Sequence, residues 1–167
     1  MSTPTLQILE RAIQAEIEGY HFYQMAAAAT ADSQGKATFE AMAEDELRHA
    51  EFLRAQHAAI SSHGHADALI RIAGEPGFDG HTPFFSTALK ARAATAHVEM
   101  TALSVAAQLE ADAMRFYREQ STAAEEPTVR AFFAELADWE RGHHDALVAQ
   151  MRSLEQEYWA VNRFAPF

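Results

Sequence analysis

The sequence predicts an all-α protein built from two repeated helical hairpins joined by a long crossover. Its 167 residues include only 7 Gly and 5 Pro, and the long segments are rich in the helix-favouring residues Ala, Leu, Glu and Gln. A Glu-x-x-His segment at 46–49 returns at 140–143, in a similar apolar context. The length suits one domain with a substantial core, so we expect a single domain over residues 1–167.

The first hairpin is expected over about residues 5–60. Its first helix ends near Ala29, because residues 30–35 contain Asp, Ser and Gly and indicate a turn. Its second helix carries Phe39 and continues to about Ile60.

One carboxylate of the first helix stands in phase with the apolar stripe. Glu16 lies seven residues after Leu9 and seven before Tyr23, whereas Glu10 and Glu18 point elsewhere and are expected in solvent. A carboxylate that faces a core is too costly to leave ionised without a partner. A positive group must therefore meet Glu16 in the core.

Residues 61–94 are expected to form a crossover connection, because Gly and Pro at 74–77 and 80–83 interrupt any long helix. Short helical pieces are expected at about 66–73 and 84–93. The connection also carries three histidines, which we interpret as surface residues rather than as a loose metal site: His63, His65 and His81.

The second hairpin is expected over about residues 95–159, followed by a tail at 160–167. Its first helix, at about 95–122, places Glu110 on the same face as Leu103 and Tyr117. After a turn at 125–127, its second helix presents the second Glu-x-x-His segment on its apolar side.

The same offset of 94 residues relates three pairs of candidate ligands. These pairs are Glu16 and Glu110, Glu46 and Glu140, and His49 and His143. On an α-helix, a Glu and a His three residues apart lie on one face, so they can hold the same metal ion. The repeat therefore predicts that four helices converge on six ligands.

The charges and donor atoms of this set favour two divalent metal ions. Four glutamates balance two divalent cations, and two neutral imidazoles complete the coordination. Carboxylate oxygen with imidazole nitrogen and no thiolate suits iron or manganese, with zinc as a substitute, and we expect two iron ions. The alternative is a bundle whose glutamates point into solvent, which their phase with the apolar stripes disfavours.

The net charge of −11 and the absence of Cys exclude several other classes. Nucleic acids and anionic membranes require clustered Lys or Arg, and none is clustered here. A chain without Cys forms no disulfide, thiolate zinc site or iron–sulfur cluster. The N-terminus has no basic region followed by an apolar run, and no segment is long enough to span a membrane, so we expect a cytoplasmic protein.

The sequence resembles the rubrerythrin branch of the ferritin-like superfamily, through Ala-Glu-Asp-Glu-Leu-Arg-His at 43–49 and through Glu16 with Phe22-Tyr23. The resemblance implies a ferritin-like four-helix bundle that holds two irons bridged by carboxylates. It also implies a protein that reduces peroxide or oxidises Fe(II).

The resemblance further implies a role for each candidate ligand. Glu46 and Glu140 would bridge the two ions. The outer ligands would be Glu16 and His49 in one half of the site, and Glu110 and His143 in the other.

Two features depart from the family pattern. The chain has no Cys for a rubredoxin centre, so turnover requires an external electron donor. The family also has an extra carboxylate ligand on the third helix, about one turn from the first. The neighbours of Glu110 at that spacing are Ala106, Ala107, Ala113 and Met114.

Tyr23 and Tyr117 each follow a candidate ligand by seven residues. Their hydroxyls either hydrogen-bond ligand carboxylates or are satisfied elsewhere, as in ordinary core tyrosines. A redox role is a third and less favoured interpretation.

We interpret the chain as a di-iron oxidoreductase that reacts Fe(II) with peroxide or dioxygen. The alternative is a non-catalytic protein that binds, stores or delivers iron through the same residues. The sequence does not separate the two.

Aromatic residues outside the ligand-bearing stripes favour a homodimer, because a second subunit is an economical cover for them. They are Phe78, Phe84, Phe85, Tyr158, Trp159, Phe164 and Phe167. A connection of about 30 residues is also long enough to exchange hairpins between chains. The alternative is that both segments fold back on their own bundle.

Overall fold

A computed structural model describes residues 3–74, 83–91 and 96–162. These residues form four long helices and one short one, and none of them forms a strand. The helices are α1 (Thr3–Ala29), α2 (Ser33–His63), α3 (Thr87–Lys90), α4 (His97–Ala123) and α5 (Pro127–Asn162). The all-α prediction is confirmed.

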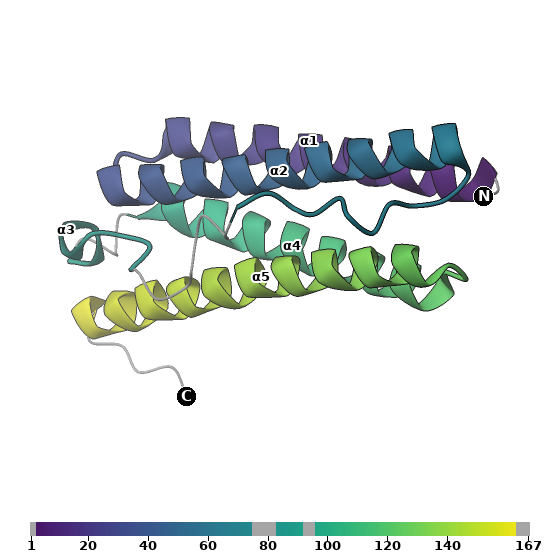
Figure 1. The fold of residues 1–167 in the computed structure, drawn as a ribbon. Coiled ribbons are helices and arrows are strands. Elements are labelled where there is room, and N and C mark those ends of the chain that lie inside the picture. The colour runs from purple at the N-terminus through teal and green to yellow at the C-terminus, as the bar shows by residue number, and fades with distance from the viewer. Residues whose placement is uncertain (1–2, 75–82, 92–95, 163–167) are drawn as a thin grey trace.

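The four long helices pair as two antiparallel hairpins (Figure 1). Hairpin one consists of α1 and α2, and hairpin two consists of α4 and α5. The two hairpins lie side by side, with the start of α1 and the α4–α5 turn at one end of the bundle and α3 at the other. This is the ferritin-like four-helix bundle that the sequence predicts.

Helix α2 begins and ends on residues suited to those positions. Asp32 caps its first turn by accepting a hydrogen bond from the N–H of Gly35 at 2.9 Å. Gly64 ends it in the left-handed conformation, with a φ of 80°, and donates its N–H to the carbonyl of Ile60. The helix therefore ends at His63 rather than at Ile60.

Helix α5 also exceeds its expected length. It continues to Asn162 and so enters the segment that was expected to be a tail. No Gly or Pro stands between Tyr158 and Asn162 to end the helix earlier.

Of the connection between α2 and α4, residues 64–74 run back along the bundle (Figure 1), and hydrogen bonds hold both this part and the part at 83–91. Near its start, the Gln56 amide donates to the carbonyl of Asp67 at 2.9 Å and accepts from the Asp67 N–H at 3.0 Å. Near its end, Asp32 accepts a hydrogen bond from the N–H of Ser86 at 3.1 Å. Asp32 thus both caps α2 and holds the connection.

Two expectations for this connection need correction. Residues 66–73 are not helical, and the Gln56 side chain bonds both backbone groups of Asp67 in this segment. Of the segment expected to be helical at 84–93, only α3 forms a helix among the described residues. Ser86 caps it by accepting from the N–H of Leu89 at 3.2 Å.

Phe84 and Phe85 are buried in their own bundle, at 0% and 1% exposure. Their ring centroids lie 4.9 and 6.3 Å from that of Phe39 on α2. A Cβ at Gly35 would come 2.4 Å from the ring of Phe85, so the glycine leaves room for this packing. These two residues therefore need no second subunit to cover them.

The other aromatic residues behind the dimer expectation are exposed, half-buried or outside the described part of the chain. Tyr158 is 37% exposed and Trp159 is half-buried. The remaining three lie outside the described residues: Phe78, Phe164 and Phe167. The homodimer stays a prediction.

Two apolar clusters fill the bundle and leave a polar band between them. One cluster contains Tyr23, Phe39 and Leu147, and the other contains Leu9, Leu53 and Tyr117. On each long helix, the candidate ligands lie between residues of the two clusters. Among the described residues, no helix is both long and apolar enough to cross a membrane.

Candidate metal centre

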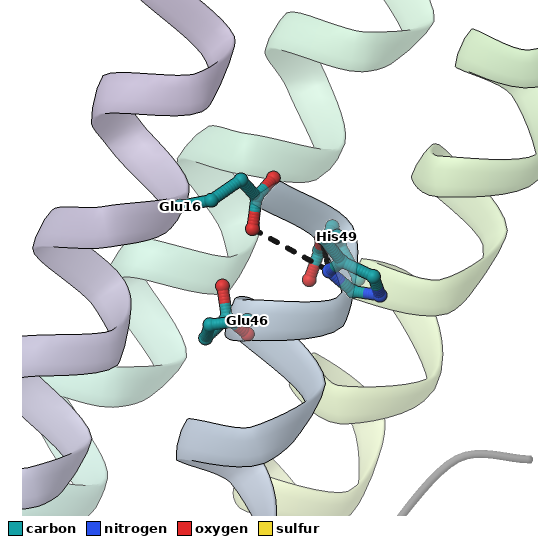
Figure 2. A group of neighbouring side chains, drawn as sticks. Glu16, Glu46 and His49 are labelled. Atoms are coloured by element: carbon teal, nitrogen blue, oxygen red, sulfur yellow. Dashed lines mark ion pairs between the residues drawn. The ribbon is translucent and has the colours of Figure 1, made fainter. Parts of the chain in front are cut away.

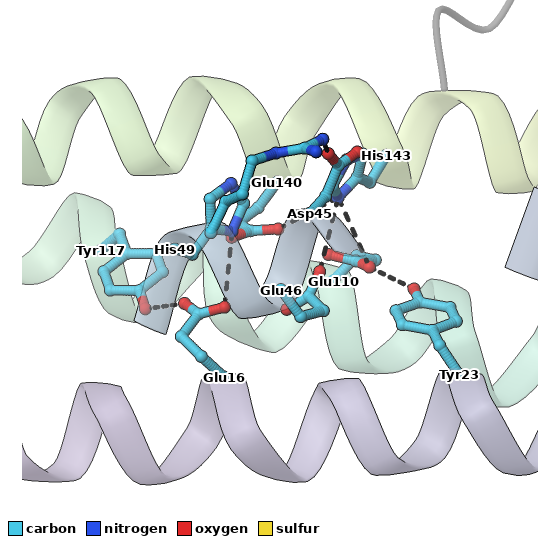
Figure 3. Close-up of polar contacts among 10 residues, drawn as sticks. Glu16, Tyr23, Asp45, Glu46, His49, Glu110, Tyr117, Glu140 and His143 are labelled. Carbon is cyan, nitrogen blue, oxygen red and sulfur yellow. Dashed lines mark hydrogen bonds and ion pairs between the residues drawn. The ribbon is translucent and has the colours of Figure 1, made fainter. Parts of the chain in front are cut away.

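The six candidate ligands meet in the polar band at the middle of the bundle (Figure 3). Helices α1 and α4 supply one carboxylate each, and α2 and α5 supply a Glu and a His one turn apart. Their exposed fractions are 3% for Glu16, 5% for Glu46, 0% for His49, 3% for Glu110, 0% for Glu140 and 1% for His143. The structure thus brings all six into the protein interior.

Two overlapping groups of four residues can each hold a metal ion. One group is Glu16, Glu46, His49 and Glu140, and the other is Glu46, Glu110, Glu140 and His143. Within each group, the ligand atoms lie within 4.8 Å of one another. Glu46 and Glu140 belong to both groups, so each is placed to reach two ions.

The first group is shown in part in Figure 2, where Glu16 of α1 faces Glu46 and His49 of α2. The Nδ1 atom of His49 lies 3.4 Å from Oε2 of Glu16 and 3.0 Å from Oε1 of Glu140. A single nitrogen of His49 therefore lies close to one carboxylate from each hairpin.

The second group repeats this arrangement from the other side. The Nδ1 atom of His143 lies 3.4 Å from Oε2 of Glu140, and 3.7 Å from Oε1 of both Glu46 and Glu110. The two imidazole rings lie nearly parallel, with centroids 6.0 Å apart. Both rings thus turn Nδ1 toward the shared carboxylates.

Six buried atoms of this set have no hydrogen-bond partner in the described part of the chain. They are Oε1 of Glu46, both carboxylate oxygens of Glu140, Nδ1 of His143 and both ring nitrogens of His49. The contacts among them do not meet the distance and angle limits of hydrogen bonds, and leaving such atoms unpaired in a protein interior is costly. Divalent metal ions would satisfy the carboxylate oxygens and the two Nδ1 atoms, so the donor set fits a two-metal site.

Without metal, protons supply positive charge to the site. Burial lowers the pKa of His49, but Glu140 and Glu16 outweigh burial and raise this pKa to about 9. Burial also opposes the charged form of His143, and Glu110 and Glu140 raise its pKa to about 10. Both imidazoles are therefore protonated on both nitrogens and positively charged at neutral pH.

The carboxylates of the site differ from one another. Burial, followed by repulsion from Glu140, raises the pKa of Glu46 well above its ordinary value and that of Glu110 to about 7. Burial also opposes ionisation of Glu140, but His49 and His143 together lower its pKa far below its usual range. Glu140 is therefore the carboxylate that stays ionised between the two imidazoles.

Each tyrosine of the site donates a hydrogen bond to a carboxylate of the opposite hairpin (Figure 3). Tyr23 of α1 donates to Glu110 of α4, and Tyr117 of α4 donates to Glu16 of α1. Burial and the bonded carboxylate raise the pKa of both hydroxyls, which therefore remain protonated donors. Of the three interpretations of these tyrosines, the geometry therefore agrees with a hydrogen bond to a candidate ligand.

Asp45 is a residue of the site that sequence reasoning missed. It is fully buried, its Oδ2 lies 3.1 Å from Nε2 of His143, and its Oδ1 accepts a hydrogen bond from Arg48. The sequence carried a signal, because Asp45 stands four residues before His49 and seven before Phe52. The phase test that identified Glu16 would also have identified Asp45.

Trp139 was missed as well. Its ring stands edge-on to the imidazole of His49, with centroids 5.0 Å apart and an interplanar angle of 87°. Its place directly before Glu140 matches that of Asp45 directly before Glu46.

Other described histidines have partners or surroundings outside the ligand set. His144 pairs with Asp145 at 3.2 Å. His63 and His65 are exposed, with ring centroids 6.4 Å apart, and His81 lies outside the described residues.

A comparison with protein families gives two matches to one family model. The family model described as Rubrerythrin matches residues 7–102 and again residues 101–164. The first match contains hairpin one except for the first residues of α1, and the second falls on hairpin two. No curated protein and no solved structure matches the chain.

Proposed function

Because this chain belongs to the rubrerythrin family, we propose that it is a di-iron oxidoreductase that reacts Fe(II) with peroxide or dioxygen. Members of this family are typically di-iron oxidoreductases, and the buried cluster of this chain can bind metal ions. The observation that carries the proposal is the sharing of Glu46 and Glu140 by two four-residue groups, because this arrangement suits a pair of adjacent ions.

The proposal assigns a role to each ligand. Glu46 and Glu140 would be shared by the two ions, while Glu16 with His49 and Glu110 with His143 would hold one ion each. When bound, the iron pair supplies electrons to the oxidant by passing from Fe(II) to Fe(III). Manganese and zinc fit the same donor atoms and are substitutes.

The chain's own residues prepare the centre in two ways. Burial of every ligand keeps bulk water away, which strengthens each charge interaction inside the bundle. The hydroxyls of Tyr23 and Tyr117 hold the carboxylates of Glu110 and Glu16, so the outer ligands keep their orientation. Oxidant and ligands therefore meet in a preorganised and dry interior.

Repeated turnover requires a source of electrons outside the chain. The electrons given to the oxidant would have to be replaced, and the sequence has no Cys with which to build a second redox centre of the iron–sulfur or rubredoxin type. We propose an external electron donor for this step, and the cytoplasm as the compartment that provides it.

The alternative is a protein that binds or delivers iron without repeated turnover. The family has an extra carboxylate about one turn from the Glu110 position, where this chain has only Ala106, Ala107, Ala113 and Met114, and this difference favours the alternative. Both functions would use the same six ligands.

Anaerobic loading with Fe(II), followed by separate mixing with peroxide and with dioxygen, tests the proposal. Ferric absorption should grow faster than it does with free Fe(II), and the faster oxidant identifies the reaction. The Glu18→Ala variant is the matched control, because Glu18 is an exposed carboxylate on the same helix as Glu16. If neither oxidant reacts faster than with free Fe(II), the chain is an iron-binding protein.

Metal analysis separates both functions from a bundle without a metal site. Protein produced with ample iron should retain two metal ions per chain after desalting. Less than one ion per chain would contradict the di-metal centre.

A further inference from the structure

The offset that relates the ligands also relates the residues beside them, and here the two hairpins differ. Asp45 corresponds to Trp139 at the same offset. Each lies against the histidine of the opposite hairpin, because Asp45 bonds His143 and Trp139 packs on His49. The two histidines therefore have matching ligand positions but different supports.

The hydrogen bond with Asp45 prepares His143 for a metal ion. Its Nε2 lies 3.1 Å from the Asp45 carboxylate, which only accepts, so Nε2 carries the donated proton. Nδ1 faces Glu110 and Glu140, and it is therefore the nitrogen that binds a metal ion once the ion displaces its proton. Both the ring orientation and the protonated nitrogen are thus fixed by the fold.

Asp45 is itself held by Arg48. A fully buried carboxylate needs a positive partner, and Arg48 donates to the oxygen of Asp45 that does not face His143. The connection packs beside this arginine, since a Cβ at Gly74 would lie 3.9 Å from its Cδ and Nε atoms. Gly142 stands at the position that matches Arg48, so hairpin two has no such side chain.

His49 lacks this support. Its Nε2 is buried and has no hydrogen-bond partner among the residues that the structure describes. Its ring instead meets the edge of Trp139 at a centroid distance of 5.0 Å. Such packing restricts the ring, but it does not determine which nitrogen carries the proton.

We propose that Asp45 is a positioning residue that makes the two metal positions unequal. The position formed with Glu110 and His143 takes the first divalent ion, and the position formed with Glu16 and His49 takes the second with lower affinity. This inference rests on the proposed two-metal site. Carboxylate partners of metal-bound histidines contribute about 10–100-fold to metal affinity, which is the difference expected between the positions.

Titration of the metal-free full chain with Co²⁺ tests this inference. Calorimetry and the visible absorption of bound Co²⁺ should resolve two binding steps that differ by about 10–100-fold in affinity. The His143→Ala variant should lose the tighter step and His49→Ala the weaker one, which assigns each step to its position.

The Asp45→Asn variant should weaken the tighter step by about 10–100-fold and leave the weaker step unchanged. Arg48 takes the single amide oxygen of the new side chain, so the amide nitrogen faces Nε2 of His143. The imidazole proton then moves to Nδ1, the nitrogen that a metal ion requires.

Two further variants complete the experiment. Asp138→Asn is the matched control, because Asp138 is an exposed aspartate of α5 that pairs with Arg141 at 3.1 Å, and it should change neither step. Arg48→Gln alters a side chain that is 24% exposed and keeps Asp45, so it should fold and weaken the tighter step to a smaller extent. If Asp45→Asn does not fold, the effect of Arg48→Gln on the two binding steps tests the inference in its place.

The outcomes separate this inference from the proposed function. Equal affinities in the unaltered chain, or equal weakening of both steps by Asp45→Asn or Arg48→Gln, would overturn the inference and leave the two-metal site intact. Binding of fewer than two Co²⁺ ions by the unaltered chain would overturn the two-metal site and the inference with it.

Discussion

Helix α2 places a buried ion pair, Asp45 with Arg48, beside the metal centre, whereas α5 places an indole and a glycine at the matching positions. A third pair of matching positions differs on α1 and α4. A Cβ at Gly19 would lie 3.0 Å from Oε2 of Glu46, and Ala113 stands at the corresponding position of hairpin two. The glycine thus leaves room next to one shared carboxylate.

The comparison shows which residues of the repeat are constrained by metal binding and which are not. Each metal ion needs the same kinds of donor atom, so the ligands are the same in both hairpins. The surrounding residues act only through the ligands, so they can differ while the fold persists. A repeat in sequence therefore does not make the two halves equivalent in affinity.

The largest effect should come from removing a carboxylate that both halves share. Glu46→Ala or Glu140→Ala leaves positive charge without compensation in the core, so both Co²⁺ steps should weaken by at least about a hundredfold. Calorimetry on the metal-free chain measures both steps. Glu18→Ala should change neither, and an equal effect of Glu18→Ala and Glu46→Ala would show that the assignment of helix faces is wrong.

Giving His49 the same Asp–Arg support that His143 has should remove the difference in affinity between the two metal positions. The double variant Trp139→Asp with Gly142→Arg gives His49 a carboxylate and an arginine, and a Cβ at Gly142 meets no atom within 4 Å. A gap of about 10–100-fold between the two Co²⁺ steps should shrink to a few-fold. Gly142→Arg alone is the control and should preserve the gap. An unchanged gap in a folded double variant would contradict the role given to the Asp–Arg pair.

Raising the pH should strengthen metal binding in both halves. The pKa values of His49 and His143, about 9 and about 10, mean that a metal ion displaces a proton from each at neutral pH. Affinity should therefore rise up to about tenfold per pH unit for each displaced proton, until the pH reaches these pKa values. Calorimetry in buffers with different ionisation enthalpies measures the released protons. Affinity that is independent of pH between about 6 and 8 would contradict this account.

The smallest effect is expected where the two halves are most alike. Tyr23→Phe and Tyr117→Phe each remove one buried hydrogen bond to a carboxylate, and each should lower the free energy of unfolding by about 1 kcal/mol. Urea unfolding of the metal-free chain measures both. Tyr20→Phe is the control, because Tyr20 is only half-buried and its hydroxyl accepts from Gln24. A large difference in the free energy of unfolding between Tyr23→Phe and Tyr117→Phe would show that the two hydrogen bonds are not equivalent.

Helical periodicity and the spacing of like residues were sufficient to predict the all-α fold and the hairpin repeat, because both are local features of the sequence. The family was predicted from the resemblance of the motifs at 43–49 and around Glu16. The same spacing placed Glu16 and Glu110 on buried faces, and the structure has both in the interior. Asp45 met the same criterion and was missed because only glutamates and histidines were tested as core-facing polar residues. The ligand roles themselves stay predictions until metal binding is measured.

Other features depend on contacts between distant residues, which no local pattern contains. Residues 66–73 have helical composition, yet they form no helix, and the amide of Gln56 on α2 bonds both backbone groups of Asp67. The burial of Phe85 depends on the missing side chain of Gly35. The sequence alone gives no sign that these residues meet.

The crossed tyrosines have a consequence for how the molecule comes apart. In arrays whose repeats merely stack, one unit can melt while its neighbour stays folded. Here Glu110 in hairpin two takes its hydrogen bond from Tyr23 in hairpin one, and Glu16 in hairpin one takes its own from Tyr117 in hairpin two. Separating the hairpins would break both of these buried hydrogen bonds at once, so we expect the two hairpins to unfold together despite the internal repeat.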